Sequence, residues 1–284
     1  MTLKGDGIGN PPVAPKDAST IVLLRDDPAG LQTFMMCRHQ RSGFLGGAHV
    51  FPGGKLDDDD MSAALHERVD GVDPQTLLAE LGEELPLERA VGLALAAVRE
   101  TLEEAGVLFG TLTDAHQLAA ARQQLNDRVP FTQVAAQHDL RFDLRALHPY
   151  ARWITPIIEN RRFDTRFYVA TVPEGQIAEP DGTETVSASW MTPAQTLDRA
   201  KNGELVLAPP TQKTLEYLAN FATSNAVIAD VHTRLPPLVD PEVVMHEKGW
   251  FLALPGDEAH PRSARSIPGA TRLILKEGRW VDFS

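Results

Sequence analysis

Residues 99–107, Arg-Glu-Thr-Leu-Glu-Glu-Ala-Gly-Val, place three carboxylates at a spacing that could bind a metal ion. In a helix, Glu100, Glu103 and Glu104 stand at i, i+3 and i+4 and project to one side. Like charges at this spacing cost roughly 0.2–0.5 kcal/mol per pair. Gly106 is suited to ending the helix, so the carboxylates would also meet the negative end of its dipole. A bound divalent cation would turn both of these unfavourable interactions, among the carboxylates and with the helix dipole, into favourable ones. The pattern therefore predicts a metal site.

Apolar residues recur at helical spacing on the opposite face of this segment: Leu95, Val98, Leu102 and Ala105. This periodicity predicts that the helix packs against a hydrophobic core and presents its carboxylates on the other side. Arg99 precedes Glu103 by four positions and can hold that carboxylate, or Glu100, in place. The alternative interpretation of the three carboxylates is an acidic helix face in solvent.

A second motif lies upstream, where residues 50–60 read Val-Phe-Pro-Gly-Gly-Lys-Leu-Asp-Asp-Asp-Asp. The glycines permit a close approach of the backbone to another segment or to a ligand. Together the two motifs resemble the signature of the Nudix hydrolases, which is Gly, five residues, Glu, seven residues, then Arg-Glu-x-x-Glu-Glu-x-Gly and an apolar residue. Gly54 matches its first glycine, and its second half is matched by Arg99, Glu100, Glu103, Glu104, Gly106 and Val107.

The chain departs from this signature in two places. Asp60 stands six residues after Gly54, where the family usually has glutamate. Residues 61–98 then separate Asp60 from Arg99, which is 38 residues in place of seven. A Nudix subfamily that includes the peroxisomal coenzyme A diphosphatases has such an interrupted box. The similarity to that subfamily covers roughly residues 17–220.

What the resemblance implies is an α/β fold, a Nudix-type α/β/α sandwich with a mixed sheet. The implied reaction is hydrolysis of a diphosphate linkage, with Mg²⁺ or Mn²⁺ neutralising the developing charge. Residue by residue, Glu103 and Glu104 match the principal metal ligands of the family. Glu100 matches a ligand that can also serve as base or orient the water. Gly53 matches the residue whose carbonyl oxygen binds metal, and Arg99 matches the orienting arginine.

Many family members add an acidic metal ligand from a distant loop, about six positions before a tryptophan. Glu184 stands six positions before Trp190 and is our first candidate, with Asp181 as the second. The alternative for Glu184 is an ordinary loop carboxylate.

Three arginines are candidates for binding the substrate's phosphates: Arg161, Arg162 and Arg166. The planar guanidinium presents paired donors that match phosphate geometry. The alternative is ion pairing at the surface with Asp164 and Glu159.

The pattern along the chain predicts a flexible leader over residues 1–16, a hydrolase domain over 17–225 and a β-rich extension over 226–284. A helical insertion is expected at about 61–91, and its glutamates, among them Glu83, are expected to face solvent. Outside it, we expect strands at 19–25, 32–38, 147–154, 165–171 and 187–191, helices at 114–126, 131–138, 193 onward and 210–222, and hairpin strands at 243–246, 249–254, 271–276 and 279–281.

Composition narrows the class of protein. The chain has 284 residues and a net charge of −12, which argues against non-specific nucleic-acid binding. Cys37 is the one cysteine, so no intramolecular disulfide can form and we expect a reducing, cytoplasmic location. No apolar run reaches transmembrane length, so we expect no membrane partner.

The leading hypothesis is a metal-dependent diphosphatase acting on coenzyme A, acyl-coenzyme A or a similar nucleotide conjugate. One alternative is a diphosphatase for ADP-ribose, NADH or another nucleotide conjugate. The other is a catalytically silent Nudix-fold module that senses a nucleotide metabolite. In each case the partner is a small nucleotide-diphosphate molecule, and the C-terminal strands are expected to cover the site or to form a homodimer interface.

Overall fold

The computed structural model describes residues 13–39, 46–111, 114–181, 185–247 and 249–283. The first regular element begins at Lys16, next to the end of the expected leader. Glu184, the first candidate for the distant acidic ligand, lies outside the described residues.

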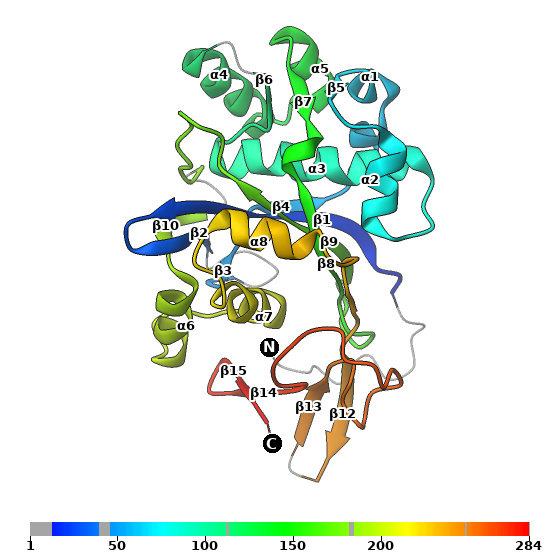
Figure 1. Cartoon of the computed structure of the whole chain (residues 1–284), viewed down its shortest axis with the longest axis vertical. Helices are drawn as coiled ribbons and strands as arrows, with labels where there is room; N and C mark the ends of the chain where they lie inside the picture. The colour runs from blue at the N-terminus through cyan, green and yellow to red at the C-terminus, as the bar shows by residue number, and fades with distance from the viewer. Residues whose placement is uncertain (1–12, 40–45, 112–113, 182–184, 248, 284) are drawn as a thin grey trace.

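A mixed sheet forms the centre of the molecule, with strand order β10-β2-β1-β9-β8-β11, β3 beside β2 and β4 beside β1 (Figure 1). Its strands are β1 (Lys16–Asp27), β2 (Gly30–Arg38), β3 (His49–Val50), β4 (Gly53–Lys55), β8 (His148–Ile154), β9 (Phe163–Thr171), β10 (Thr185–Met191) and β11 (Leu238–Val239). Strand β1 runs parallel to β9 and antiparallel to β2, so the sheet is mixed as expected.

Helices cover both faces of this sheet (Figure 1). One face carries α1 (Ala63–His66), α2 (Pro74–Leu81), α3 (Leu87–Ala105), α4 (Ala115–Asn126) and α5 (Phe131–Gln137). The other carries α6 (Pro193–Lys201), α7 (Pro209–Leu218) and α8 (Ser224–Val231). The α/β/α sandwich is therefore confirmed. The start of α6 follows the expected pattern, because the Thr192 hydroxyl accepts a hydrogen bond from the Gln195 amide and Pro193 follows it.

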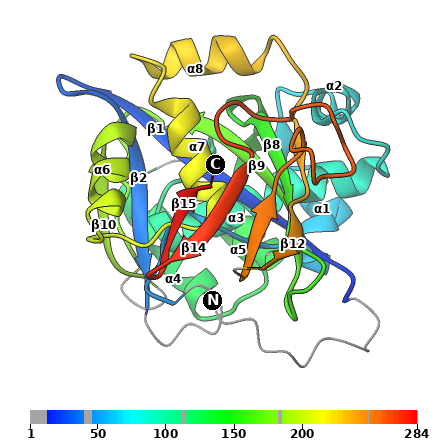
Figure 2. The same ribbon diagram turned by 90° about the horizontal axis from the view of Figure 1, so that it is seen from below.

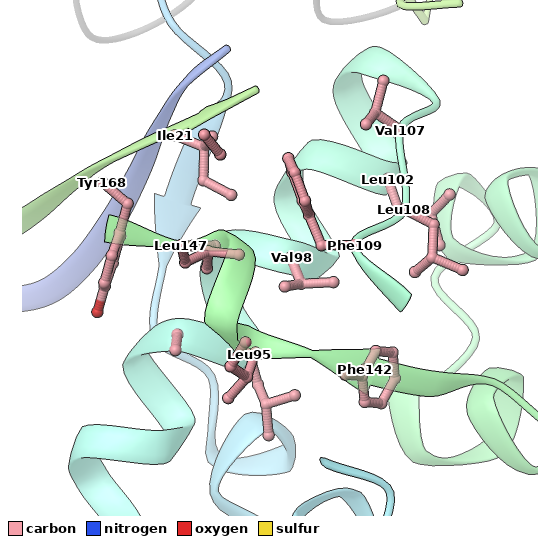
Figure 3. Close-up of a cluster of buried hydrophobic side chains, with 14 of the residues drawn as sticks. Ile21, Leu95, Val98, Leu102, Val107, Leu108, Phe109, Phe142, Leu147 and Tyr168 are labelled. Atoms are coloured by element: carbon pink, nitrogen blue, oxygen red, sulfur yellow. The ribbon is translucent and has the colours of Figure 1, made fainter. Parts of the chain in front are cut away.

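Alternating side chains of β1 supply the two hydrophobic cores. Ile21 belongs to the core on the α3 side, together with Val98 and Tyr168 (Figure 3). Val22 belongs to the core on the other side, together with Leu215 of α7. Successive strand residues point to opposite faces, so a central strand buried on both sides must be apolar throughout.

Strand β1 changes its partner along its length, and this change positions the glycine turn. Residues 24–27 pair with β2, whereas residues 18–20 pair with β4. Strands β1 and β2 therefore diverge, and the Ile21 amide donates a hydrogen bond to the carbonyl of Pro52 in the turn between β3 and β4. The turn at residues 51–54 is thus fixed beneath α3, with which β4 is in contact.

The insertion folds as helical segments that lead directly into α3. It follows the 3₁₀ helix η2 (Asp58–Met61) and contains α1, β5 (Val69–Asp70) and α2. A small sheet of order β5-β7-β6, with β6 (Gly110–Thr111) and β7 (Arg141–Asp143), ties it to later segments; the 3₁₀ helix η3 (Leu144–Ala146) follows β7.

The expectation that Glu83 faces solvent is wrong. Its carboxylate lies 2.6 Å from Arg166 and 2.7 Å from Arg152, and only 10% of the side chain is exposed. The connection between α2 and α3 brings Glu83 to arginines of β8 and β9, and sequence spacing carries no information about such a contact.

The C-terminal region departs from the expected β-rich extension at 226–284. Helix α8 was not predicted, although Thr223 caps it by accepting a hydrogen bond from the Ala226 amide. Strand β11 joins the main sheet beside β8. The separate C-terminal sheet therefore begins later, with β12 (Glu242–His246), β13 (Gly249–Ala253), β14 (Arg272–Lys276) and β15 (Arg279–Asp282).

This second sheet lies on the side of the main sheet away from α3 (Figures 1 and 2). The expected hairpin between β14 and β15 is present, and Glu277 and Gly278 have φ of 51° and 77° in its turn. Among the described helices, none combines the length and the apolar character needed to span a membrane.

Candidate active site

The three box glutamates lie in the last turns of α3, as the sequence predicts. The helix ends at Gly106, which has φ of 69° and donates its amide to the Leu102 carbonyl over 3.1 Å. Glycine adopts this left-handed conformation at no steric cost. The expected apolar face is confirmed, since four of its residues have no exposed surface: Leu95, Val98, Leu102 and Ala105.

The glycine turn meets the carboxylates directly, so the two halves of the split motif form one site. The Gly53 amide donates a hydrogen bond to Glu104 Oε2 over 2.9 Å. Gly54 packs so closely on Glu100 that a Cβ at this position would overlap the carboxylate. A larger residue at position 54 would therefore have to displace the Glu100 carboxylate.

Arg99 is buried and links both halves of the motif. Its Nε and Nη2 donate to the two carboxylate oxygens of Asp60 over 2.8 and 2.9 Å. Nη1 donates to Glu100 Oε1 over 2.7 Å, and Nη2 also donates to the Lys55 carbonyl. Asp60 has no exposed surface. The short arm of Asp60 thus suffices, because η2 brings its carboxylate to Arg99 despite the insertion.

Burial controls the protonation of the carboxylates beside Arg99. It raises the pKa of Glu100, and the guanidinium of Arg99 opposes the rise. It raises the pKa of Asp60 in the same way, against hydrogen bonds from Arg99. Desolvation penalises the charged form of an acid, so a nearby cation is needed to keep these groups ionised.

The candidate ligand atoms at this site suit a hard divalent cation. Carboxylate oxygens and a backbone carbonyl are the ligands that Mg²⁺ and similar ions prefer. In the described part of the chain, however, no three acidic, histidine or cysteine side chains converge as a ligand group. Glu100 and Glu104 bond to separate partners, Arg99 and Gly53, while Glu103 lies 3.6 Å from Arg128. The metal-ligand roles of these residues therefore stay predictions.

Arg166 does not lie at the surface, where a substrate phosphate would meet it. Only 2% of its side chain is exposed, and it forms ion pairs with three carboxylates: Asp17, Glu83 and Asp164. Every guanidinium nitrogen donates to a protein oxygen. The alternative for Arg166 was ion pairing at the surface. Arg166 does form ion pairs, but they belong to a buried network.

The other two candidate arginines lie in the loop between β8 and β9. Arg162 donates to the carbonyls of Thr155 and Val13 over 3.0 and 2.8 Å. Arg161 is exposed, and no contact within the described residues occupies its guanidinium. Asp181, the second candidate for the distant metal ligand, is half-buried.

Two arginines that the sequence did not single out also lie at the carboxylate turn. Arg122 of α4 donates to the main-chain carbonyls of Glu103 and Glu104 over 3.1 and 2.9 Å. Arg128 has φ of 64°, an uncommon value for a residue with a side chain, and lies beside the carboxylate of Glu103. The sequence around Arg122 and Arg128 gives no sign of these contacts, because both residues lie in the segment that follows the motif.

Comparisons with known proteins agree with this site. The family model described as NUDT19 Nudix domain matches residues 15–218. The human acyl-coenzyme A diphosphatase NUDT19 is 30% identical over 90% of this chain and 81% of its own length. The protein of the same name from Xenopus laevis is 26% identical over 91% of this chain and 78% of its own length.

A solved structure agrees with the fold as well. The crystal structure of a NUDIX hydrolase from Alicyclobacillus acidocaldarius superposes with a TM-score of 0.58 and 26% identity, and the match covers 79% of this chain and 98% of that one. Nudix hydrolases generally use divalent metal cations. The split motif meets in space, and the family model covers most of the sequence. This chain therefore belongs to the Nudix hydrolases, in the family of the NUDT19 Nudix domain.

Proposed function

We propose that this protein hydrolyses the diphosphate linkage of coenzyme A or acyl-coenzyme A with Mg²⁺ or Mn²⁺ as cofactor. The observation that carries the proposal is the joined site, in which Gly53 and Gly54 contact Glu104 and Glu100 across the insertion. The substrate class is supported by relatives named acyl-coenzyme A diphosphatase.

In this proposal the carboxylates of Glu100, Glu103 and Glu104, with the Gly53 carbonyl, hold the metal. Glu184 or Asp181 would add a further carboxylate. When bound, the metal would neutralise the charge of the diphosphate and favour deprotonation of the attacking water.

The remaining chemistry falls to groups of the chain. Glu100 is the candidate to accept the proton of the attacking water at its carboxylate. Arg99 orients that carboxylate through the 2.7 Å hydrogen bond, and Asp60 fixes Arg99 in turn. Arg161 is the first candidate for contact with the substrate's phosphates, since its guanidinium is exposed. Arg162 ranks below it because two carbonyls already occupy its donors, and Arg166 is left out of the proposal.

Product analysis by mass spectrometry tests the proposal. Purified protein with Mg²⁺, and in parallel with Mn²⁺, is incubated with coenzyme A, acetyl-coenzyme A, ADP-ribose, NADH and a diadenosine polyphosphate. We expect 3′,5′-ADP and phosphopantetheine from coenzyme A, and the acylated counterpart from acetyl-coenzyme A. Cleavage of another conjugate alone would reject the coenzyme A substrate. Ligand-induced stabilisation with no product from any compound would favour a nucleotide sensor.

We also propose a cytoplasmic location and binding to neither nucleic acid nor membrane, on the basis of composition and charge. The C-terminal sheet is our candidate for a homodimer interface. Light scattering of the full chain tests it, since a monomeric mass at micromolar concentration would reject the dimer.

A further inference from the structure

Arg122 is placed where it can control the geometry of the carboxylate turn. It lies on α4, eighteen or more residues beyond the carboxylates, and its guanidinium reaches back to the end of α3. Nε donates to the Glu103 carbonyl over 3.1 Å, and Nη2 donates to the carbonyls of Glu104 and Glu179 over 2.9 and 2.8 Å. One side chain therefore binds the backbone of two proposed metal ligands and of a separate segment.

The carbonyls it binds are those that the helix leaves without partners. The last carbonyls of a helix have no intrahelical amide to accept from. Here Leu102 accepts from the Gly106 amide and Ala105 accepts from the Glu179 amide. The carbonyls of Glu103 and Glu104 are bonded by Arg122. A cation at this end also offsets the negative end of the helix dipole, which otherwise repels the carboxylates.

Hydrogen bonds also fix residues 176–179 against the end of α3. Leu108 exchanges two hydrogen bonds with the Gln176 side chain, each of 2.8 Å. The Glu179 amide and carbonyl bond to Ala105 and Arg122. Just beyond this segment lies Asp181, the second candidate for the distant ligand, whose charge also interacts with Arg122.

Gly106 makes room for this arrangement. Its φ of 69° favours glycine, and a Cβ there would lie 2.9 Å from Arg122 Nη1. The residue that ends the helix therefore also admits the guanidinium that completes its hydrogen bonding.

We propose that Arg122 is a positioning residue, which holds the backbone of the carboxylate turn of α3 and of the segment around Glu179 in the place from which the carboxylates bind the metal. This inference rests on the proposed metal-dependent function. Residues that orient metal ligands without touching the metal typically change metal affinity by about 10- to 100-fold when they are removed.

If Arg122 acted only through its charge, its removal would strengthen metal binding. Arg122 is a cation near a proposed cation site, so its removal lowers the local repulsion and would tighten metal binding. A role confined to folding would lower the melting temperature and leave the affinity unchanged. The direction of the affinity change thus separates positioning from both alternatives.

The experiment titrates Mn²⁺ alone into the full chain and follows bound metal by electron paramagnetic resonance, with the melting temperature as second readout. The variants are Arg122→Met, Arg122→Lys and the control Arg68→Met. Arg68 is also partly buried and also donates to a main-chain carbonyl, that of Leu140. We expect about 10- to 100-fold weaker Mn²⁺ binding in Arg122→Met. We expect a smaller loss in Arg122→Lys, which keeps the charge and loses the fork of donors, and no loss in Arg68→Met.

Equal or tighter Mn²⁺ binding in a folded Arg122→Met protein would overturn the inference. If that variant does not fold, Arg122→Lys decides alone, and wild-type affinity in it would overturn the inference. A wild-type protein that binds no Mn²⁺ and cleaves no substrate would instead reject the proposed function, so the two failures are distinguishable.

Discussion

Two clusters of arginines and carboxylates, each built around one buried arginine, lie on the α3 side of the central sheet, and their charge balance differs. The Arg166 cluster sets three arginines against three carboxylates: Arg89, Arg152, Arg166, Asp17, Glu83 and Asp164. The Arg99 cluster sets two arginines, the buried Arg99 and the exposed Arg128, against four carboxylates: Asp57, Asp60, Glu100 and Glu103. Glu104 lies next to it on the glycine turn.

The balance suggests different roles for the two clusters. In the Arg166 cluster the charges neutralise one another, so the cluster can stabilise the fold with nothing added. In the Arg99 cluster the negative charge exceeds the positive charge, and buried like charges are costly unless a cation joins them. Arg166, which the sequence suggested as a phosphate contact, thus lies in the balanced cluster, and the excess of negative charge lies around Arg99.

The largest expected effect is that of Glu103→Gln, which removes one surplus charge and keeps the shape of the side chain. We expect a loss in kcat on the order of 10³-fold, at the upper end of what a single electrostatic contact supplies in an active site. The protein should stay folded, because glutamine has the same shape as glutamate and the removed charge belongs to a cluster in which negative charge is in excess. Turnover assays and thermal unfolding measure the two effects.

Glu88→Gln is the matched control, since Glu88 is an exposed carboxylate in the first turn of the same helix. It should keep full activity. Normal turnover in a folded Glu103→Gln protein would reject the site assignment.

Arg166→Met should destabilise the fold and spare the chemistry. Removing one partner of a buried pair costs about 3–5 kcal/mol, because it leaves uncompensated charge. Urea unfolding of this variant, beside Arg145→Met as a control, measures the difference. The Arg145 pair with Asp143 is exposed, so its removal should cost at most about 1 kcal/mol. A raised KM with unchanged unfolding free energy would restore Arg166 as a phosphate contact.

Added metal should stabilise the protein through the Arg99 cluster alone. At about 100 times its dissociation constant, a ligand that binds only the folded state adds about 2.7 kcal/mol. We expect Mg²⁺ to raise the melting temperature of the wild type and of Arg166→Met by similar amounts. Glu103→Gln should lose most of this gain, and a chelator should reverse it. An equal gain in all three proteins would place the bound metal elsewhere.

Gly54→Ala should give the smallest effect, because it displaces a carboxylate without removing one. The added Cβ overlaps the Glu100 carboxylate. Overpacking of this kind costs roughly 1–3 kcal/mol. We expect a lower unfolding free energy and a fall in kcat, since Glu100 must move away from Arg99. If crystals of the variant showed Glu100 in its original place with full activity, the close contact would have no functional role.

Local patterns predicted much of the fold. The apolar and acidic faces of α3, its end at Gly106 and the Thr192 cap of α6 each depend on contacts within about four residues. Helix α8 was missed although Thr223 offers a cap of the same kind, so that signal was present in the sequence. Glu83 was predicted to face solvent and is nearly buried, because its partners Arg152 and Arg166 lie far along the chain, Arg166 by 83 residues.

The sequence by itself determined the amphipathic helix, the carboxylate spacing and the glycines at both ends of the split motif. These depend on backbone preference and on helical periodicity, which act over short distances. Only the tertiary structure decided which arginines pair with carboxylates far away in the sequence. Arg99 meets Asp60 across 39 residues, whereas Arg166 is enclosed by carboxylates of other elements. Hydrogen bonds and charge pairs depend on separation in space, and the fold sets that separation.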